Sequence, residues 1–295
     1  MKFVSYVHAG RESYGLLQED GSVLDVPAAA PGLPATLHGF IAAGGAALAR
    51  AHALAPGRGV PARELRLLAP IPHPVKNVFC VGRNYKDHVA EGYLARGQET
   101  KLPEFPQFFT KPPTAVMGPD DEFPYDPGVT KALDYEVELA VVIGTTGRDI
   151  PREQAMAHVF GVTILNDITG RDLQRRHDQW FKGKGLDSSC PMGPFVLTLD
   201  AVPDLGAMEL TTHVNGEARQ RSQVRELIFD IPEIITQLSR GMTLEAGDII
   251  ATGTPSGVGY AMNPPRLLQA GDTVVCAITG LGHLTTRITA AGTPL

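Results

Sequence analysis

A predominantly β, α+β fold is the class that this chain of 295 residues predicts. Short β-branched and aromatic runs recur between glycine and proline turns, whereas helical periodicity is confined to a few stretches. That pattern favours a β-rich α+β domain over the regular strand-helix alternation of a parallel sheet. Hydrophobic residues make up 43% of the chain and charged residues 20%, as in a globular protein that builds a core without disulfides.

The first 72 residues predict a small N-terminal α+β domain. Three strand-like runs within residues 2–26 form an antiparallel meander, with turns at Ala9-Gly10 and Asp20-Gly21. Residues 36–54 are alanine-rich, have apolar side chains at helical spacing and predict one helix. Clustered prolines around residues 70–74 disfavour both helix and central strand, so we place the domain boundary there.

Residues 73–295 predict the larger domain. Many short strands separated by turns are expected, with three helical stretches at residues 85–96, 151–158 and 231–240. The stretch from Gly97 to Pro127 holds seven prolines, and we expect packing to order it or the wall of a site to include it.

The charge and cysteine content exclude several classes of partner. A net charge of -6 provides no basic surface for nucleic acid or for an anionic membrane, so an anionic substrate requires local positive charge. Three cysteines without a CxxC spacing indicate thiols in a reducing compartment, and we expect a cytoplasmic protein. No apolar run approaches the ~18 residues that a membrane helix requires.

Acidic residues alternate along one predicted strand. Asp134, Glu136 and Glu138 share one face, since side chains two apart on a strand point the same way. A solvent-exposed face explains such alternation equally well. The adjoining run 140–143 is apolar on both faces, however, and places the strand in a core, where carboxylates require a proton, an ion pair or a cation.

A fourth acid, Asp167, ends the next apolar strand. An Asn-Asp pair at a strand end usually begins a turn or caps a helix. Together with Glu136 and Glu138, however, Asp167 completes an all-oxygen set suited to Mg²⁺. The sequence has no cysteine-histidine cluster that would indicate zinc.

Three further segments supply candidate catalytic or binding groups. On a helix, His88 and Glu91 lie on one face, so the carboxylate can orient the imidazole as a general base, although most pairs at this spacing are surface pairs. Lys184 lies between two glycines, which suits close approach to an anion, although exposed loop lysines are commoner. The glycine-rich segment 252–259 is a candidate anion cradle that lacks the nucleotide-binding pattern GxxxxGK[ST].

Five motifs in order resemble the fumarylacetoacetate hydrolase family. They are the segments RNYKDH (83–88), DYEVEL (134–139), NDITGRDLQ (166–174), QWFKGK (179–184) and TGTPSGVG (252–259). The resemblance covers residues 72–295 and extends in a weaker form to the N-terminal part. It implies a mixed β-roll catalytic domain, and it implies a homodimer.

The same resemblance implies roles for individual residues. Glu136, Glu138 and Asp167 become ligands of Mg²⁺, with Mn²⁺ and Ca²⁺ as alternatives. His88 and Glu91 become a water-activating dyad on a mobile lid, and Lys184 stabilises enolate charge. The residues expected to contact substrate oxygens are Arg83, Tyr85, Arg171, Gln174 and Thr254.

The implied substrates are small 2-oxo acids, and three activities remain open. We expect hydrolysis of a carbon-carbon bond in an acylpyruvate such as fumarylpyruvate or fumarylacetoacetate, as in the catabolism of aromatic compounds. The alternative keeps the site without an attacking water, as an isomerase, decarboxylase or tautomerase of 2-hydroxymuconate-type acids or oxaloacetate. The third is a non-catalytic metal-binding module, because a shared fold does not guarantee shared chemistry.

Overall fold

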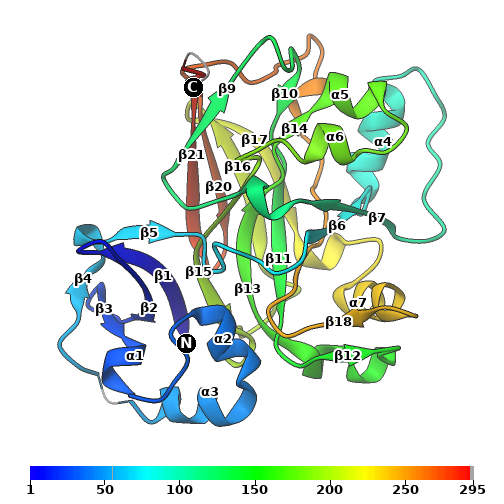
Figure 1. The fold of residues 1–295 in the computed structure, drawn as a ribbon. Coiled ribbons are helices and arrows are strands. Elements are labelled where there is room, and N and C mark those ends of the chain that lie inside the picture. Colours follow the sequence, from blue (N-terminus) through cyan, green and yellow to red (C-terminus); the bar gives the residue numbers. More distant parts are fainter. Residues whose placement is uncertain (55, 293–295) are drawn as a thin grey trace.

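The computed structural model describes residues 1–54 and 56–292 and is built mainly of two β-sheets with helices around them (Figure 1). The larger sheet has twelve strands, ten of them in one continuous path. In spatial order, the path runs through β4 (Val60–Pro61), β3 (Ser22–Asp25), β2 (Arg11–Leu17), β1 (Lys2–His8), β15 (Cys190–Thr198), β13 (Val159–Asn166), β11 (Val137–Ile143), β19 (Ile249–Ala251), β6 (Val78–Gly82) and β7 (Gln107–Lys111). Two short strands pair at its side, β5 (Arg66–Leu68) with β1 and β8 (Val116–Met117) with β15.

The second sheet has five strands and packs against the first. Its order is β17 (Glu217–Gln223), β16 (Glu209–Val214), β20 (Thr273–Ile278), β21 (Gly282–Ala290) and β9 (Glu122–Tyr125). Two small ribbons complete the strands, β10 (Leu133–Asp134) with β14 (Thr169–Gly170) and β12 (Gly147–Arg148) with β18 (Thr243–Leu244). The predicted α+β class with a predominance of strands is confirmed.

Strand β11 lies in the interior and separates two apolar cores. All seven of its residues are buried. Leu139 and Val141 belong to the core shared with the five-stranded sheet, whereas Ala140 and Val142 belong to the core beneath the N-terminal helices. This alternation follows the twofold period of a strand and explains why the run is apolar on both faces.

The N-terminal segment continues the main sheet. The meander of β1, β2 and β3 is confirmed, and β1 pairs with β15, so that Phe3 lies opposite Val196. Phe3 also packs on Phe40 and Phe160, joining the two predicted domains in one core. The boundary between residues 72 and 73 stays a prediction.

One predicted helix is wrong. Residues 36–54 form two helices, α2 (Leu37–Ala42) and α3 (Gly44–His52), preceded by the short helix α1 (Val26–Ala29). The chain divides at Gly44, whose φ of +70° is a left-handed conformation that ends a helix and that glycine adopts without strain.

Helices of the larger domain agree in part with the prediction. Two of the three predicted stretches contain α4 (Lys86–Leu94) and α7 (Ile231–Ser239), and the third is a 3-10 helix, η3 (Arg152–His158). Two short helices were not predicted, α5 (Arg171–Arg176) and α6 (Phe181–Lys184). The other 3-10 turns are η1 (Ala62–Glu64), η2 (Pro113–Ala115), η4 (Leu199–Ala201), η5 (Val224–Glu226) and η6 (Gly259–Ala261). Within the described residues, every helix is too short or too polar to cross a membrane.

Candidate metal centre and catalytic cavity

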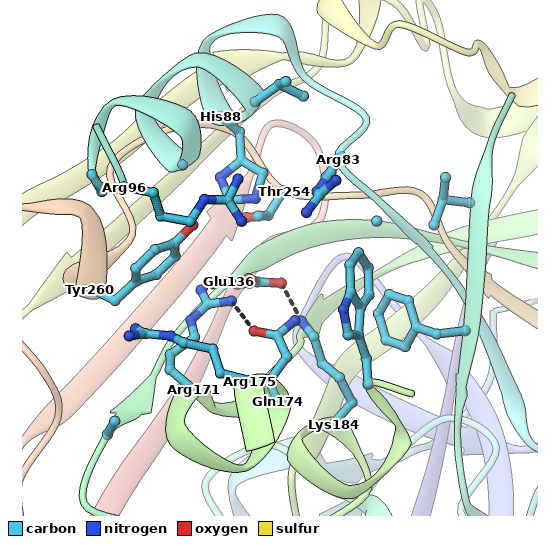
Figure 2. A pocket seen from close by; sticks show the side chains of 18 of the residues that line it. Arg83, His88, Arg96, Glu136, Arg171, Gln174, Arg175, Lys184, Thr254 and Tyr260 are labelled. Atoms are coloured by element: carbon cyan, nitrogen blue, oxygen red, sulfur yellow. Dashed lines mark hydrogen bonds and ion pairs between the residues drawn. The ribbon is translucent and has the colours of Figure 1, made fainter. Parts of the chain in front are cut away.

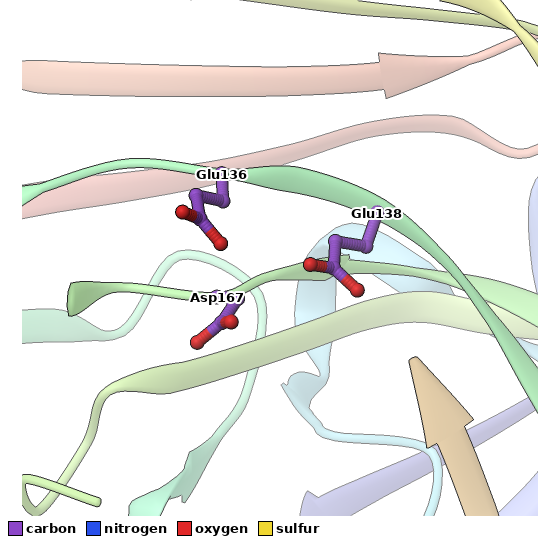
Figure 3. Close-up of side chains that lie close together, drawn as sticks. All are labelled: Glu136, Glu138 and Asp167. Carbon is purple, nitrogen blue, oxygen red and sulfur yellow. The ribbon is translucent and has the colours of Figure 1, made fainter. Parts of the chain in front are cut away.

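Three carboxylates converge where β11 and β13 meet. The antiparallel register places Val137 opposite Asn166, and the N–H of Asp167 donates to the carbonyl oxygen of Glu136 at 2.8 Å. One carboxylate oxygen each from Glu136, Glu138 and Asp167 lies within 4.8 Å of the others (Figure 3). All three side chains are buried. The structure therefore brings together the three residues that the sequence predicts as metal ligands.

Asp134, the other acid of the predicted face, has a different role. Strand geometry is interrupted at residues 135 and 136, between β10 and β11. The carboxylate of Asp134 accepts hydrogen bonds from the backbone N–H groups of Gly259 and Tyr260, and it pairs with Arg171 Nε at 2.9 Å. Asp134 thus fixes Arg171 and the 252–259 loop beside the three carboxylates.

Two buried cations, Lys184 and Arg171, pair with carboxylates of the triad. Lys184 Nζ lies 2.7 Å from Glu136 Oε2 and 2.5 Å from Asp167 Oδ2, and Arg171 Nη2 lies 2.6 Å from Glu136 Oε1. Burial opposes the ionisation of Glu136, but the charges of Arg171 and Lys184 outweigh it and lower the pKa of this carboxyl. Burial also opposes the charge of Lys184, yet Asp167 and Glu136 raise its pKa.

The crowding of carboxylates around Glu138 makes the triad fit a divalent cation. Burial, followed by the charges of Asp167 and Glu136, raises the pKa of Glu138 well above its ordinary value. Asp167 Oδ1 is buried and accepts no hydrogen bond within the described chain, although Lys111 Nζ lies 2.9 Å away. A bound cation would relieve the crowding of like charges and could be coordinated by Asp167 Oδ1. An all-oxygen donor set of this kind suits Mg²⁺ or a similar hard ion.

Lys111 at the end of β7 is a functional candidate that the sequence analysis missed. Its side chain is fully buried, and its ammonium group donates to the carbonyl oxygens of Ile168, Lys184 and Ser189. These contacts join the Asp167 turn to helix α6. No local pattern around Lys111 indicates such a partner set, because the residues of these carbonyl groups lie between 57 and 78 positions away in sequence.

His88, which is buried, and Glu91, which is partly buried, form a pair on α4. His88 Nδ1 lies 2.8 Å from Glu91 Oε1, and the second oxygen of Glu91 accepts the backbone N–H of Gly257 at 2.8 Å. The ring's other nitrogen, Nε2, has no hydrogen bond to the described residues, and His88 lines the cavity. His88 and Glu91 are therefore not an ordinary pair on the protein surface, and His88 Nε2 can contact a substrate or water in the cavity.

The 252–259 loop holds protein carboxylates. Gly253 N–H donates to Glu138 Oε2 at 2.7 Å, while Gly257 and Gly259 donate to Glu91 and Asp134. A Cβ at Gly253 would lie 2.7 Å from Asn84 Cβ, so the close approach requires glycine there. The amides of these glycines therefore donate to carboxylates of the chain, whereas the sequence suggested that they bind an anionic ligand.

A cavity of about 740 Å³ opens above the triad (Figure 2). Its wall includes five cationic side chains, namely Arg83, Arg96, Arg171, Arg175 and Lys184. Glu136 and Glu138 also line it, and Figure 2 shows His88 and Tyr260 on the side of α4 and η6. The cavity thus places a cation site, an imidazole and positive charge around one space.

Four of the five predicted substrate contacts line this cavity. They are Arg83, Arg171, Gln174 and Thr254. Tyr85 is 2% exposed and is absent from the lining, and its hydroxyl has no hydrogen-bond partner in the described chain. Arg96, Arg175, Tyr260 and Trp180 line the cavity without having been predicted. Arg175 could have been found from the sequence, because it follows Arg171 by four residues and the two share a face if the segment is helical. The sequence analysis did not recognise this helix.

The comparisons with known proteins agree with this geometry. Residues 77–289 match the family model described as Fumarylacetoacetate (FAA) hydrolase C-terminal. The chain is 45% identical to oxaloacetate tautomerase YisK of Bacillus subtilis (strain 168), over 98% of this chain and all of the relative. It is 41% identical to the mitochondrial oxaloacetate tautomerase FAHD2A of Bos taurus, over 95% of this chain and 87% of the relative.

Solved structures are similar along the whole chain. A fumarylacetoacetate hydrolase from Exiguobacterium antarcticum has 41% identity and a TM-score of 0.82, covering 98% of this chain and 99% of that one. A 5-carboxymethyl-2-hydroxymuconate delta-isomerase from Mycobacterium smegmatis has 32% identity and a TM-score of 0.76, covering 99% of this chain and all of the other. The similar proteins thus bear the names of hydrolases, isomerases and tautomerases.

Proposed function

Since this chain belongs to the fumarylacetoacetate hydrolase family, we propose that it is a metal-dependent tautomerase that interconverts the keto and enol forms of oxaloacetate. The observation that carries the proposal is the full-length 45% identity to an oxaloacetate tautomerase, on a chain whose own residues place a general base beside a cation site. Carbon-carbon hydrolysis, the activity expected first from the sequence, has weaker support than the alternative of an isomerase, decarboxylase or tautomerase.

Glu136, Glu138 and Asp167 would hold the divalent ion, for which we propose Mg²⁺, with Mn²⁺ or Ca²⁺ as substitutes. When bound, the ion supplies Lewis acidity that polarises the 2-oxo group and lowers the energy of the enolate. Asp134 and Lys111 support this centre by holding Arg171 and the Asp167 turn in place.

His88 is proposed to carry the proton. Its Nε2 accepts a proton from C3 of the keto acid, while Glu91 holds Nδ1 and stabilises the imidazolium that forms. Glu91 is itself fixed by Gly257 N–H, so the ring orientation is set before the substrate binds. The proton returns from His88 to the enolate oxygen for the enol, or to C3 for the keto form.

Lys184 and Arg171 are proposed to stabilise the charge of the enolate. Both side chains are buried and line the cavity beside Glu136. Positive groups held in position before the reaction stabilise developing negative charge without reorganising at the moment of transfer. Gln174, which accepts from Arg171 Nη1 at 3.3 Å, and Thr254 are proposed to contact the substrate oxygens.

The test follows the ultraviolet absorbance of enolic oxaloacetate as it decays to the keto form. Protein loaded with Mg²⁺ is expected to accelerate the decay, EDTA-treated protein to lose the acceleration, and added Mg²⁺ to restore it. Buffer with Mg²⁺ alone is the control, because free ions also promote enolisation. Full acceleration by metal-free protein would contradict the proposed mechanism.

Hydrolysis is the second candidate function, and the similarity to the Exiguobacterium fumarylacetoacetate hydrolase favours it. In this mechanism His88 deprotonates a water that attacks the distal carbonyl group. Proton NMR of acetylpyruvate or fumarylpyruvate incubated with the Mg²⁺-loaded protein distinguishes the two activities, since hydrolysis yields two acids. The homodimer that the family resemblance implies and the cytoplasmic location that the cysteine content indicates also stay proposals.

A further inference from the structure

The mouth of the cavity carries arginines that no carboxylate neutralises. Arg171, deep in the cavity, pairs with Asp134 and Glu136. By contrast, Arg96 and Arg175 are exposed, line the same cavity and have no acidic partner within salt-bridge distance among residues 1–54 and 56–292. A concave space lined by charges of one sign raises the local concentration of ligands of the opposite sign, here anions.

Two helices direct these arginines to the same space. On α4 and its C-terminal turn, His88, Gly92 and Arg96 follow one another at intervals of four residues and all line the cavity. On α5, Arg171 and Arg175 have the same spacing. Residues four apart share a helix face and lie ~6 Å apart along its axis. Arg175 is therefore about one turn farther from the metal centre than Arg171.

Tyr260 lies between the two helices and holds the arginine side chains. Its ring centroid lies 4.5 Å from Arg171 Cζ and 5.6 Å from Arg175 Cζ. A Cβ at Gly92 would lie 2.9 Å from the Tyr260 hydroxyl, so glycine at this position allows the ring to approach α4. In Figure 2, Arg96 and Arg175 extend from the two sides of this ring.

We propose that Arg96 and Arg175 form a subsite for the far carboxylate of the substrate and so make the enzyme selective for dianionic 2-oxo acids. This proposal rests on the proposed function in one respect, because it takes the 2-oxo end of the ligand to bind at the triad. Arginine suits this role because its planar guanidinium can donate two hydrogen bonds to one carboxylate. Asp178 also lines the cavity, but it pairs with neither arginine.

A matched pair of ligands tests the subsite without requiring turnover. 2-Oxoglutarate and 2-oxovalerate share the 2-oxo acid end and the chain length, and only the first has a second carboxylate. Oxalate probes the metal end alone. Titration calorimetry of the Mg²⁺-loaded protein is expected to show ~10-fold or tighter binding of 2-oxoglutarate than of 2-oxovalerate, a difference of ~1.4 kcal/mol.

Three variants locate the source of this preference. Arg96→Gln and Arg175→Gln are each expected to reduce the preference for 2-oxoglutarate severalfold and to leave oxalate affinity unchanged. Arg176→Gln is the matched control, because Arg176 is an exposed neighbour on α5 that does not line the cavity. Thermal unfolding monitored by circular dichroism verifies that all three variants fold.

Several outcomes would overturn the subsite. These are equal affinity of the wild-type protein for the two ligands, a preference retained in both cavity variants, an equal loss in Arg176→Gln, or a parallel loss of oxalate affinity. A dianion preference that depends on Arg96 and Arg175 supports the subsite even if oxaloacetate is not tautomerised. In that case the proposed function fails and the binding assignment stands.

Discussion

Replacing Lys184 by methionine removes the ammonium group that lies between two carboxylates of the candidate metal centre. The Nζ atom is 2.7 Å from Glu136 Oε2 and 2.5 Å from Asp167 Oδ2, and all three side chains are buried. Methionine keeps most of the length of lysine without its charge. The variant therefore leaves two buried carboxylates with less compensation while it changes packing little.

The expected loss of stability is large in the absence of metal. Removing one partner of a buried ion pair costs about 3–5 kcal/mol, because the other charge stays buried. For a chain of this length, such a loss lowers the melting temperature by roughly 5 °C or more. Lys111 and Arg171 stay in place and limit the loss, since each lies within 3 Å of a triad carboxylate.

Mg²⁺ is expected to restore more stability to the variant than it adds to the wild type. In the wild-type protein the ion competes with the ammonium group of Lys184 for Glu136 and Asp167. In the variant this competitor is gone, and only Arg171 and Lys111 still pair with these two carboxylates. An ion at 100 times its dissociation constant stabilises the native state by ~2.7 kcal/mol. The variant is therefore expected to bind Mg²⁺ more tightly. At a given Mg²⁺ concentration, its free energy of unfolding then rises more than that of the wild type.

The measurement is urea and thermal unfolding, followed by circular dichroism, in EDTA and in a series of Mg²⁺ concentrations. Lys182→Met is the matched control, because Lys182 is exposed on the same helix and has no salt bridge in the described chain. The reasoning fails if Lys184→Met is as stable as the control without metal, or if its Mg²⁺-dependent gain is no larger than that of the wild type.

His88→Gln is expected to lower the rate of oxaloacetate tautomerisation by about 10²–10⁴-fold, the usual contribution of a general base, with Mg²⁺ affinity unchanged by calorimetry. Unchanged turnover would exclude His88 as the base. In Asp25, burial opposes ionisation, but hydrogen bonds from Ala28 N–H, Tyr6 and Ser13 and the charge of Arg11 lower the pKa below 3.8. The stabilisation of the native state by the Asp25 carboxylate is present above pH 3.8 and is lost as the pH falls through the lower pKa of the folded state. Asp25→Asn is therefore expected to lower the free energy of unfolding at pH 7, and to lower it less at pH 2. A pH-independent loss in urea titrations would contradict that assignment.

Local spacing was enough to predict the chemical groups of the site. Glu136 and Glu138 are two residues apart, His88 and Glu91 three apart, and Asp167 follows an apolar strand. These relations depend on backbone periods that operate over a few residues, so that the sequence alone indicates which side chains share a face. The β-rich class and the N-terminal meander follow from the same short-range periods.

Contacts between distant segments required the tertiary structure. The register that sets Val137 opposite Asn166 brings Asp167 to the glutamates, and Lys111 reaches the same centre from a strand 56 positions earlier. Arg96 and Arg175 share one cavity only because α4 and α5 both border Tyr260. Such contacts depend on how sheets and helices pack, which no short-range period of the sequence encodes.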